Sequence, residues 1–464
     1  MPPKPLALRE TPIPGLLVLD LPVPGDNRGW FKENWQREKM LALGLPDFGP
    51  VQNNVSFNDE VGVTRGIHAE PWDKFVSVVL GKVFGAWVDL REGPSFGTVF
   101  TVEIDPTVAV FVPRGVANSY QTLEPQTVYS YLVNDHWSPD AGAKYTFLNL
   151  ADETVAVPWP IPLEDAILSD KDKLHPRLAN VVPMPPRKTL VLGANGQLGR
   201  ALRGAFPDAE FAERGELDIT APEFATARAW RDYAVIINAA AYTKVDEAET
   251  DAGRKAAWSA NVVGVTALAR VATANGITLV HISSDYVFDG TAESHPEDEP
   301  FSPLGVYGQT KAAGDAIVAA VPRHYLVRTS WVVGDGNNFV RTMKSLAERG
   351  IDPRVVDDQF GRLSFASELA AGIRHLIDCR APYGTYNLTG SGAPVSWAEI
   401  ARRVFAAVGS DPQRVAGVTT DEYFAGKTGA PRPRNSALTL DKIESVGFAP
   451  RDHFVALDDY LSQH

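Results

Sequence analysis

A glycine-rich segment that begins nearly two hundred residues into the chain constrains the fold most strongly. It follows a short apolar run at residues 189–192, and such a run predicts a buried parallel strand. Its glycines permit a tight turn that lets the backbone approach a pyrophosphate, and a helix starting near Gln197 would direct free N–H groups at that anion. The segment therefore predicts a dinucleotide-binding unit preceded by a separate domain. The residues assigned to this turn are Gly193, Asn195, Gly196, Gln197, Leu198 and Gly199.

Composition narrows the class of protein further. A chain of 464 residues is too long for one core and fits two or three. Its formal net charge of −13 argues against nucleic acid or an anionic membrane as a partner. The one cysteine, Cys379, excludes an internal disulfide framework and suits a reducing compartment. No apolar segment is long enough for a signal region or a membrane span, so we expect a cytoplasmic protein without a membrane partner.

The two halves of the chain differ in their patterns. Residues 1–168 contain short strand-like runs separated by Gly and Pro, which predict an all-β barrel or double-sheet jelly roll. Residues 169–187 are rich in proline and charge and are predicted to be a linker. Residues 188–464 alternate apolar strands with Ala-rich amphipathic stretches, which predict a doubly wound parallel sheet covered by helices on both faces.

Three signals downstream of the glycine turn predict hydride-transfer chemistry. Small residues end one strand, Ser284 ends the next, and Tyr307 and Lys311 stand four apart, on one face of a helix. A nearby ammonium lowers the pKa of a phenol, so the tyrosine can protonate a carbonyl oxygen while a nicotinamide delivers hydride. Each signal alone is common on solvated helices and loops, but their order and spacing together favour the enzymatic interpretation. The small residues and the tyrosine that follows them are Ala239, Ala240, Ala241 and Tyr242.

A second candidate site surrounds His68 in the first half. A lone histidine is usually structural, but cations flank this one and amides lie on a neighbouring segment. Such a group suits a diphosphate and a developing enolate. A metal-binding cupin is the competing interpretation, and we expect no metal because His68 and Glu70 lack a second histidine cluster. The cations are Arg28, Arg65 and Lys74, and the amides include Gln52 and Asn54.

Residues 188–464 resemble the dTDP-4-dehydrorhamnose reductases of the extended short-chain dehydrogenase/reductase superfamily. The similarity rests on segments such as Leu217 to Thr220, Pro303 to Gly308, Arg328 to Trp331 and Arg432 to Ser436. It implies that Ser284, Tyr307 and Lys311 are catalytic, with Tyr307 and Lys311 also at the cofactor. It further implies that Trp331 and Asn338 face the sugar nucleotide, and that Asp218 and Ile219 flank the adenine. Arg214 favours NADPH, with NADH as the alternative, and residues 200–203 lack the acidic residue that would bind Mg²⁺.

The first half resembles the dTDP-4-dehydrorhamnose 3,5-epimerases, which have a cupin-like jelly roll. The matching segments are residues 26–31, 52–56, 65–68, 112–117 and 152–160. The resemblance implies that His68 is the base, that Asp152 orients it, that Lys74 stabilises the enolate and that Tyr131 returns a proton. It also implies that Arg28, Arg65, Gln52 and Asn54 hold the nucleotide and sugar, and that the chain forms a homodimer through this half. Asn118 and Trp137 depart from the family pattern, which leaves open whether both C3 and C5 are epimerised.

The two halves together predict a bifunctional enzyme. The first would invert centres next to a ketone of dTDP-4-dehydro-6-deoxy-D-glucose, and the second would reduce that ketone to give dTDP-L-rhamnose. The alternatives are the same chemistry on another dTDP- or UDP-deoxysugar, or a non-catalytic NADP-binding regulatory protein. The intact pair of Tyr307 and Lys311 speaks against the regulatory alternative.

Overall fold

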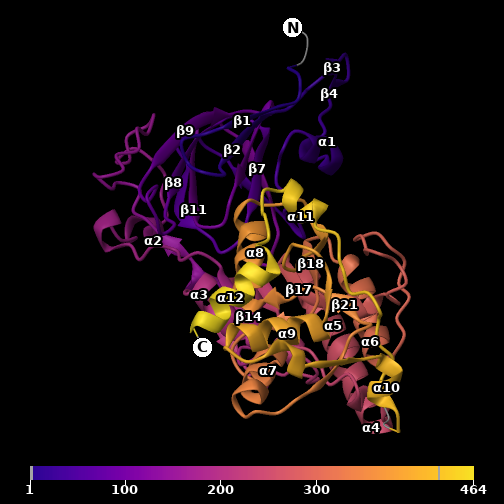
Figure 1. Cartoon of the computed structure of the whole chain (residues 1–464). Helices are drawn as coiled ribbons and strands as arrows, with labels where there is room; N and C mark the ends of the chain where they lie inside the picture. The colour runs from indigo at the N-terminus through magenta and orange to yellow at the C-terminus, as the bar shows by residue number, and fades with distance from the viewer. Residues whose placement is uncertain (1–3, 427–428, 464) are drawn as a thin grey trace. The chain divides into compact units, whose positions relative to one another are not determined.

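The computed structural model describes residues 4–426 and 429–463. The chain divides into two compact units, Met1–Pro186 and Arg187–His464. The first unit is all-β and the second is α/β (Figure 1), which confirms the predicted fold class.

The first unit consists of two antiparallel sheets. Their strand orders are β1-β2-β10-β7-β12-β5 and β13-β6-β11-β8-β9. The first sheet contains β1 (Ala7–Glu10), β2 (Leu17–Asp20), β5 (Gln52–Asn58), β7 (Lys74–Leu80), β10 (Val108–Val112) and β12 (Thr127–Val133). The second contains β6 (Thr64–Ala69), β8 (Val83–Asp89), β9 (Val99–Ile104), β11 (Val116–Thr122) and β13 (Thr146–Phe147). A hairpin of β3 (Gly25–Asp26) and β4 (Gly29–Trp30) and two short helices, α1 (Arg37–Ala42) and α2 (Asp170–Lys173), complete the unit.

Strand β10 is buried on both of its faces. All five of its residues are apolar and buried. Because side chains alternate between the two faces of a strand, Val108 and Val110 pack with Trp87 in the core between the sheets. Phe111 packs instead with Met40 of α1 on the outer face. Helix α1 therefore covers apolar surface that a simple two-sheet sandwich would expose.

Residues 169–187 are predicted from their proline content to be a linker, but all of them except Arg187 belong to the first unit. Val181 and Met184 are buried in its core. The Met184 N–H donates to the carbonyl of Leu90 at 2.8 Å, which ties the segment to the end of β8. Proline content signals a backbone without long helices or strands, and only short helical turns such as α2 form here, but it does not reveal the apolar residues that anchor the segment.

The second unit is built around a six-stranded parallel sheet with the order β15-β14-β16-β17-β18-β23. Its strands are β14 (Lys188–Leu192), β15 (Glu210–Ala212), β16 (Tyr233–Asn238), β17 (Thr278–Ser284), β18 (His324–Thr329) and β23 (Gly384–Asn387). Its helices are α3 (Gln197–Ala205), α4 (Asp251–Trp258), α5 (Val265–Asn275), α6 (Val306–Ala319) and α8 (Ala366–Asp378), and a π-helical segment, Ser259–Gly264, joins α4 to α5.

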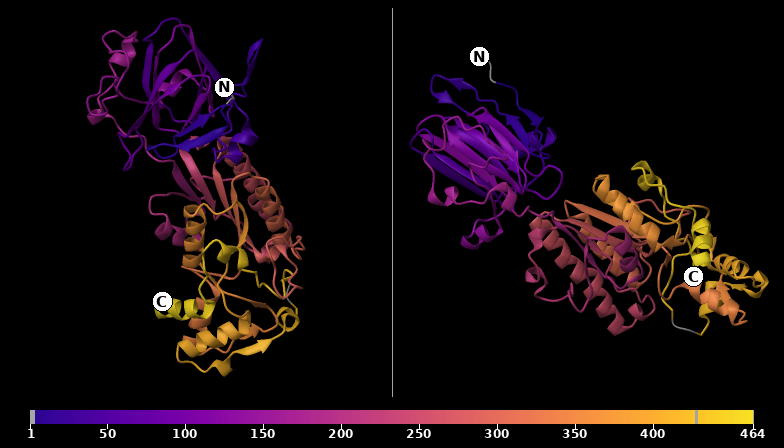
Figure 2. Two further views of the ribbon diagram at one scale, coloured as in Figure 1. Left: turned by 90° about the horizontal axis from the view of Figure 1, so that it is seen from above. Right: turned by 90° about the vertical axis from the view of Figure 1, so that its left-hand side faces the viewer.

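Alternate residues of the central strands pack into two separate hydrophobic cores, one on each face of the sheet. Leu190 and Leu192 of β14 pack with α5, whereas Val191 packs with α3 and α8. Helices therefore cover both faces of the sheet, as Figure 2 shows. In the sheet, β15 lies on one side of β14 and β16 on the other, so the direction in which strands are added reverses at β14. Ligands of such folds bind at this switch point, at the carboxyl ends of the strands.

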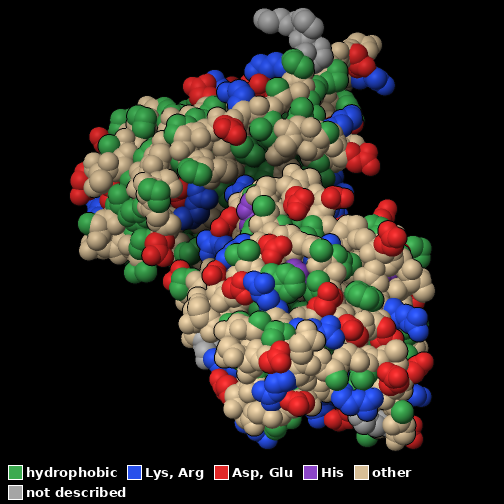
Figure 3. Space-filling view, in the orientation of Figure 1, with side chains coloured by type: hydrophobic (Ala, Val, Ile, Leu, Met, Phe, Trp, Pro, Cys, Tyr) green, Lys and Arg blue, Asp and Glu red, His purple; other side chains and the backbone are tan. Residues whose placement is uncertain are grey.

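A smaller lobe with its own core completes the second unit. Its core joins α7, α9 and α12 and includes Val340, Val404 and Leu457. Over the described part of the chain, no helix is both long and apolar enough to cross a membrane. On the face of this unit that Figure 3 shows, acidic and basic side chains are interspersed. The lobe elements are β19 (Val332–Val333), α7 (Phe339–Glu348), β20 (Arg354–Val356), β21 (Phe360–Gly361), β22 (Ser364–Phe365), β24 (Val395–Ser396), α9 (Trp397–Ala407), β25 (Ala416–Val418), α10 (Thr420–Phe424) and α12 (His453–Gln463). Helix α11 (Asp441–Ser445) instead packs its Ile443 in the core of the parallel sheet.

Candidate functional site

A cavity of about 650 Å³ opens in the first unit where β6, β7, β11 and β12 meet. The predicted residues Arg65, His68, Lys74 and Tyr131 line it. They come from three strands of two sheets, so their convergence depends on how the sheets pack. The volume of the cavity suits a small polar ligand, and His68 is part of its lining.

The partner of His68 is Asp172, not Asp152. His68 Nε2 lies 2.9 Å from Asp172 Oδ1, on helix α2. Burial alone would raise the pKa of Asp172, but the hydrogen bond and charge of His68 lower it on balance. Asp172 is therefore an ionised acceptor that fixes the orientation of the imidazole.

The prediction for Asp152 is corrected by its surroundings. Its carboxylate accepts hydrogen bonds from the backbone N–H groups of Thr154, Val155 and Leu178 at 2.6–3.0 Å. These bonds close a turn and hold the segment that carries α2. Asp152 thus supports the fold around the site, while Asp172 contacts the histidine.

Lys74 and Tyr131 lie together beside the cavity. Lys74 is buried, forms an ion pair with buried Glu70, and places its Nζ 5.5 Å from the centre of the Tyr131 ring. Burial, followed by the charge of Glu70, raises the pKa of Tyr131 to about 12. At neutral pH the phenol is therefore protonated and can donate a proton into the cavity.

Three of the predicted substrate ligands lie outside the lining of this cavity. Gln52 and Asn54 lie on β5 and hydrogen-bond to each other at 2.8 Å. Arg28 lies in the exposed β3–β4 hairpin and pairs with Asp26. Within one chain, the structure thus brings Arg65 to the cavity and leaves these three side chains outside its lining.

The glycine turn of the second unit has the geometry of a dinucleotide-binding loop. Gly193 has φ +78°, and a Cβ there would lie 2.7 Å from backbone atoms of Ala239 and Ala240. A Cβ at Gly199 would collide with the carbonyl of Gly193. Helix α3 follows with Gly196 as its N-cap and no side-chain cap, so its first N–H groups face outward. The donor set therefore fits a pyrophosphate.

A second cavity of about 650 Å³ extends from this turn. Arg214 and Asp218 form a hydrogen bond of 3.1 Å on its wall, and the Arg214 side chain remains 82% exposed. Of the other predicted turn residues, Gln197 accepts a hydrogen bond from Gly334 N–H at 2.8 Å, and Leu198 packs in the core. The predicted residues that line the cavity are Gly193, Asn195, Gly196, Arg214, Asp218, Ile219, Ala239, Ala240, Ala241 and Tyr242.

Ser284, Tyr307 and Lys311 lie together at the carboxyl end of β17 and the start of α6. Burial raises the pKa of Tyr307 to about 12, and a hydrogen bond with Ser284 opposes that rise. Lys311 Nζ donates to the carbonyl of Ile282 at 2.7 Å, and burial lowers its pKa to about 8. The structure thus reverses the expected direction for Tyr307, because burial dominates. The result is a protonated phenol at neutral pH, which a proton donor requires.

Asp285 is a buried carboxyl next to this group that the sequence analysis missed. It is 2% exposed, and Ser284 Oγ donates to its Oδ1 at 3.0 Å. Burial raises the pKa of Asp285 to about 6, against the opposing hydrogen bonds of Ser436 and Ser284. A carboxyl with a raised pKa at a strand end is typical of functional sites.

This raised pKa predicts a pH-dependent stabilisation by Asp285→Asn. Since the folded pKa exceeds the unfolded one, the ionised carboxylate destabilises the folded state above about pH 6, by up to ~3 kcal/mol. The variant should melt at a higher temperature than the parent at pH 7.5, and the gain should disappear near pH 4. Calorimetry across this range measures the effect.

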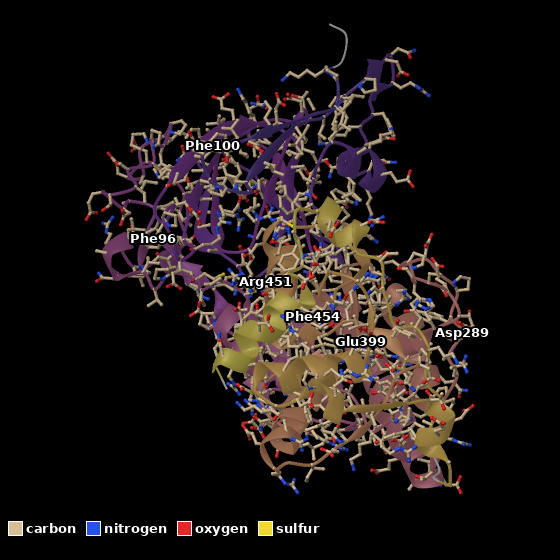
Figure 4. The ribbon with its side chains drawn as sticks, viewed as in Figure 1. Phe96, Phe100, Asp289, Glu399, Arg451 and Phe454 are labelled. Atoms are coloured by element: carbon tan, nitrogen blue, oxygen red, sulfur yellow. The ribbon has the colours of Figure 1, made fainter. Side chains whose placement is uncertain are left out.

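The control for this prediction is Asp289→Asn, in the loop after β17 (Figure 4). Hydrogen bonds from Thr291 lower the pKa of Asp289, so its replacement should not stabilise the protein at pH 7.5. A loss of stability in Asp285→Asn that is equal at all pH values would contradict the raised pKa.

The two predicted sugar-nucleotide residues differ in their surroundings. Trp331 stacks on Trp397 with ring centres 3.7 Å apart, and Trp397 lines a cavity of about 330 Å³ in the smaller lobe. Asn338 is the N-cap of α7, and its amide donates to Gly334 and Tyr460. The structure therefore brings Trp331 near a cavity, whereas the side chain of Asn338 is engaged in the protein's own hydrogen bonds.

The two units of the chain match two different protein families. Residues 187–464 match the family model described as RmlD substrate binding domain, and residues 10–180 match dTDP-4-dehydrorhamnose 3,5-epimerase. The RmlC homolog of Streptococcus pyogenes is 55% identical over 190 residues, which cover 40% of this chain and 95% of that protein. The chain belongs to both families.

Two further relatives match the reductase-family unit. The dTDP-4-dehydrorhamnose reductase of Aggregatibacter actinomycetemcomitans is 37% identical over 286 residues, covering 57% of this chain and 95% of that protein. A solved structure of the Bacillus anthracis dTDP-4-dehydrorhamnose reductase in complex with NADP is 31% identical, with a TM-score of 0.54. It covers 60% of this chain and 99% of that chain.

One sequence pattern could have indicated the helix that carries Asp172, the residue missed in the epimerase-family unit. Ser169 caps α2 by accepting from the Asp172 N–H at 3.2 Å, and Ser followed three residues later by an acidic residue is a helix-start pattern. That pattern predicts a short helix inside the segment assigned to the linker. It does not reveal that the helix carries the partner of His68.

Proposed function

We propose that the chain is a bifunctional enzyme that epimerises and then reduces dTDP-4-dehydro-6-deoxy-D-glucose to dTDP-L-rhamnose. The observation that carries the proposal is the presence of two complete proton-transfer groups in one chain. One is His68 with Asp172 beside Lys74, and the other is Tyr307 with Ser284 beside a dinucleotide-binding turn. The family matches over both units support the same pair of reactions.

In the epimerase-family unit, His68 removes a proton next to the C4 ketone. Asp172 holds the ring and balances the positive charge that develops on it. Lys74 and Arg65, both at the cavity, stabilise the enolate oxygen and the diphosphate. Tyr131, which is protonated at neutral pH, returns a proton to the carbon from the other side.

In the reductase-family unit, a reduced nicotinamide supplies the hydride when it is bound. Tyr307 donates its proton to the ketone oxygen, and the Ser284 hydroxyl, which in the structure donates to Asp285, turns to hydrogen-bond the same oxygen when the substrate is bound. Lys311 is held by the Ile282 carbonyl on the same side of α6 and provides positive charge beside the phenol. NADPH is the proposed cofactor, because the exposed guanidinium of Arg214 lines the cavity and can bind a 2′-phosphate.

The cavity of the smaller lobe suits the nucleotide part of the substrate. Phe339 and Trp397 offer aromatic faces for a base, and Arg432 offers a cation for a phosphate. Arg432 is itself oriented by two hydrogen bonds of 2.9 Å to Asp246. These features favour a sugar nucleotide over a small free ketone.

The direct test is incubation of the full chain with dTDP-4-dehydro-6-deoxy-D-glucose and NADPH. We expect stoichiometric oxidation of NADPH and an NMR spectrum of dTDP-L-rhamnose. A product with unchanged configuration at C3 and C5 would contradict the epimerase part. Absence of NADPH oxidation, even with substrate epimerised beforehand, would contradict the reductase part.

The corrected pairing of His68 gives a separate prediction. Asp172→Asn should slow epimerisation at least ~10-fold, because a carboxylate that orients a catalytic histidine in hydrolases contributes up to ~10⁴-fold. Asp152→Asn should keep the rate and lower the melting temperature, since its bonds are to backbone N–H groups. Exchange of deuterium into C3 and C5 measures the rate. A normal rate in Asp172→Asn would refute the pairing.

We further propose that the chain dimerises through its first unit. Strand β5 lies at the edge of its sheet, and Val55 and Phe57 on it are 62% and 54% exposed. Exposed apolar residues on an edge strand favour pairing with another chain. Light scattering at micromolar concentration should give the mass of a dimer, and Phe57→Lys should shift it toward the monomer.

A further inference from the structure

Three metal-ligand groups converge on the wall of the epimerase cavity. They are His68 on β6, Asp172 on α2 and His175 just after α2, and one donor atom from each lies within 4.8 Å of the other two. Asp172 Oδ1 is 2.9 Å from His68 Nε2 and 3.9 Å from His175 Nε2. His175 has no part in the proton transfers proposed above.

These separations are close to those of a tetrahedral zinc site. With bonds of about 2.0–2.1 Å to nitrogen and oxygen, neighbouring ligand atoms of a tetrahedral Zn²⁺ lie roughly 3.3 Å apart. The two distances to Asp172 Oδ1 lie on either side of that value. The donor atoms of His68 and His175 lie within 4.8 Å of each other, so a shift of these two rings toward a shared ion would complete three protein ligands. All three ligands line the cavity, so a metal would enter from it.

The three side chains also offer the donor types that transition metals bind. Burial, followed by the charge of His68, lowers the pKa of His175, so its ring is neutral at neutral pH. Its Nδ1 is buried and its Nε2 faces Asp172, while stacking on Phe147 at 4.6 Å holds the ring. Two imidazoles and one carboxylate suit zinc, cobalt or nickel. Lys74, one of the cations that line the cavity, forms an ion pair with Glu70, so its charge is already balanced.

We propose that His68, Asp172 and His175 form an inhibitory site for a divalent transition metal such as Zn²⁺. The proposal rests on the role assigned to His68 under the proposed function. Asp172 holds the ring proton on His68 Nε2, which leaves Nδ1 free to abstract the substrate proton. A metal on Nε2 shifts the ring proton to Nδ1, so a metal-loaded epimerase unit has no base and is inactive. The reductase-family unit, whose catalytic residues are different, continues to work. Free metal thereby uncouples the two reactions of one chain.

Binding is tested first without any substrate. Co²⁺ added to the full chain should give the intense visible absorption of a four-coordinate site at one equivalent, and Zn²⁺ should abolish it. His175→Gln should weaken binding at least tenfold. The control His136→Gln removes an exposed histidine of the same unit and should bind as the parent does. Equal binding by His175→Gln and the parent, or no binding, would overturn the site.

Inhibition is tested by deuterium exchange at C3 and C5. Micromolar Zn²⁺ should stop exchange in the parent and in His136→Gln, and a chelator should restore it. His175→Gln should exchange normally and need at least tenfold more Zn²⁺ for the same loss. NADPH oxidation with substrate epimerised beforehand should not change. Binding without loss of exchange would overturn the inhibitory role, whereas absence of exchange in metal-free parent would count against the proposed function and leave the binding result intact.

Discussion

Replacing Tyr307 with phenylalanine will lower the rate of ketone reduction by at least ~10²-fold, the lower end of what general acid catalysis contributes. The Tyr307 phenol is protonated at neutral pH because burial raises its pKa to about 12, and the variant has no proton at that position. Most of the cofactor would lie in the cavity at the glycine turn, whose lining does not include Tyr307, and phenylalanine keeps the ring, so binding should largely persist. Single-turnover oxidation of NADPH measures the rate, and cofactor fluorescence measures binding.

The matched control is Tyr325→Phe. Tyr325 is also buried in the second unit, and its hydroxyl donates to the Ala381 carbonyl at 2.6 Å in the core. Its loss should cost stability and leave the rate unchanged. If Tyr307→Phe oxidises NADPH at nearly the parental rate, the assignment of Tyr307 as proton donor is wrong.

The second large effect is expected for His68→Ala. Without its base, the first unit should lose ~10²- to 10⁴-fold in epimerisation rate. The variant given dTDP-4-dehydro-6-deoxy-D-glucose should therefore consume little NADPH, because its reductase unit receives the wrong isomer. Loss of deuterium exchange at C3 and C5 would locate the defect in the first unit.

Rescue separates a missing base from a misfolded protein. A separate 3,5-epimerase added to His68→Ala should restore NADPH oxidation to the parental rate, since the second unit has its own core. His136→Gln, which alters an exposed histidine in the same unit, should need no rescue. Unaided full activity of His68→Ala with normal exchange would mean that His68 is structural.

The architecture could be predicted because local patterns determine it. Strand β14 contains an apolar run that ends at a glycine. Its alternate side chains are buried on opposite faces of the sheet, because helices cover both faces of a parallel sheet. The same reasoning failed for residues 169–186. Their prolines indicate irregular backbone, but only tertiary packing shows that Val181 and Met184 are anchored.

The sites were predictable where residues lie close in sequence, and less so where the fold brings them together. Tyr307 and Lys311 are four residues apart on one helix, so spacing alone places them on one face. Asp172 reaches His68 across 104 residues of chain, and nothing in its local sequence encodes that contact. The pKa of Tyr307 was misjudged for a related reason, because burial is a property of the whole unit.

The end of the first unit also determines where the two activities can be divided. Met184 is still anchored, the Pro185 carbonyl accepts a hydrogen bond from Arg114 at 2.8 Å, and β14 starts at Lys188, so the folded parts are joined by Pro186 and Arg187. A spacer inserted between these two residues leaves both modules whole. A cut at residue 168 would separate Asp172 from His68 and leave an epimerase fragment with a base but no orienting acid. An engineered epimerase module should therefore end at residue 186. The proline-rich segment before that residue, which resembles a linker in composition, is part of the epimerase-family unit and carries Asp172.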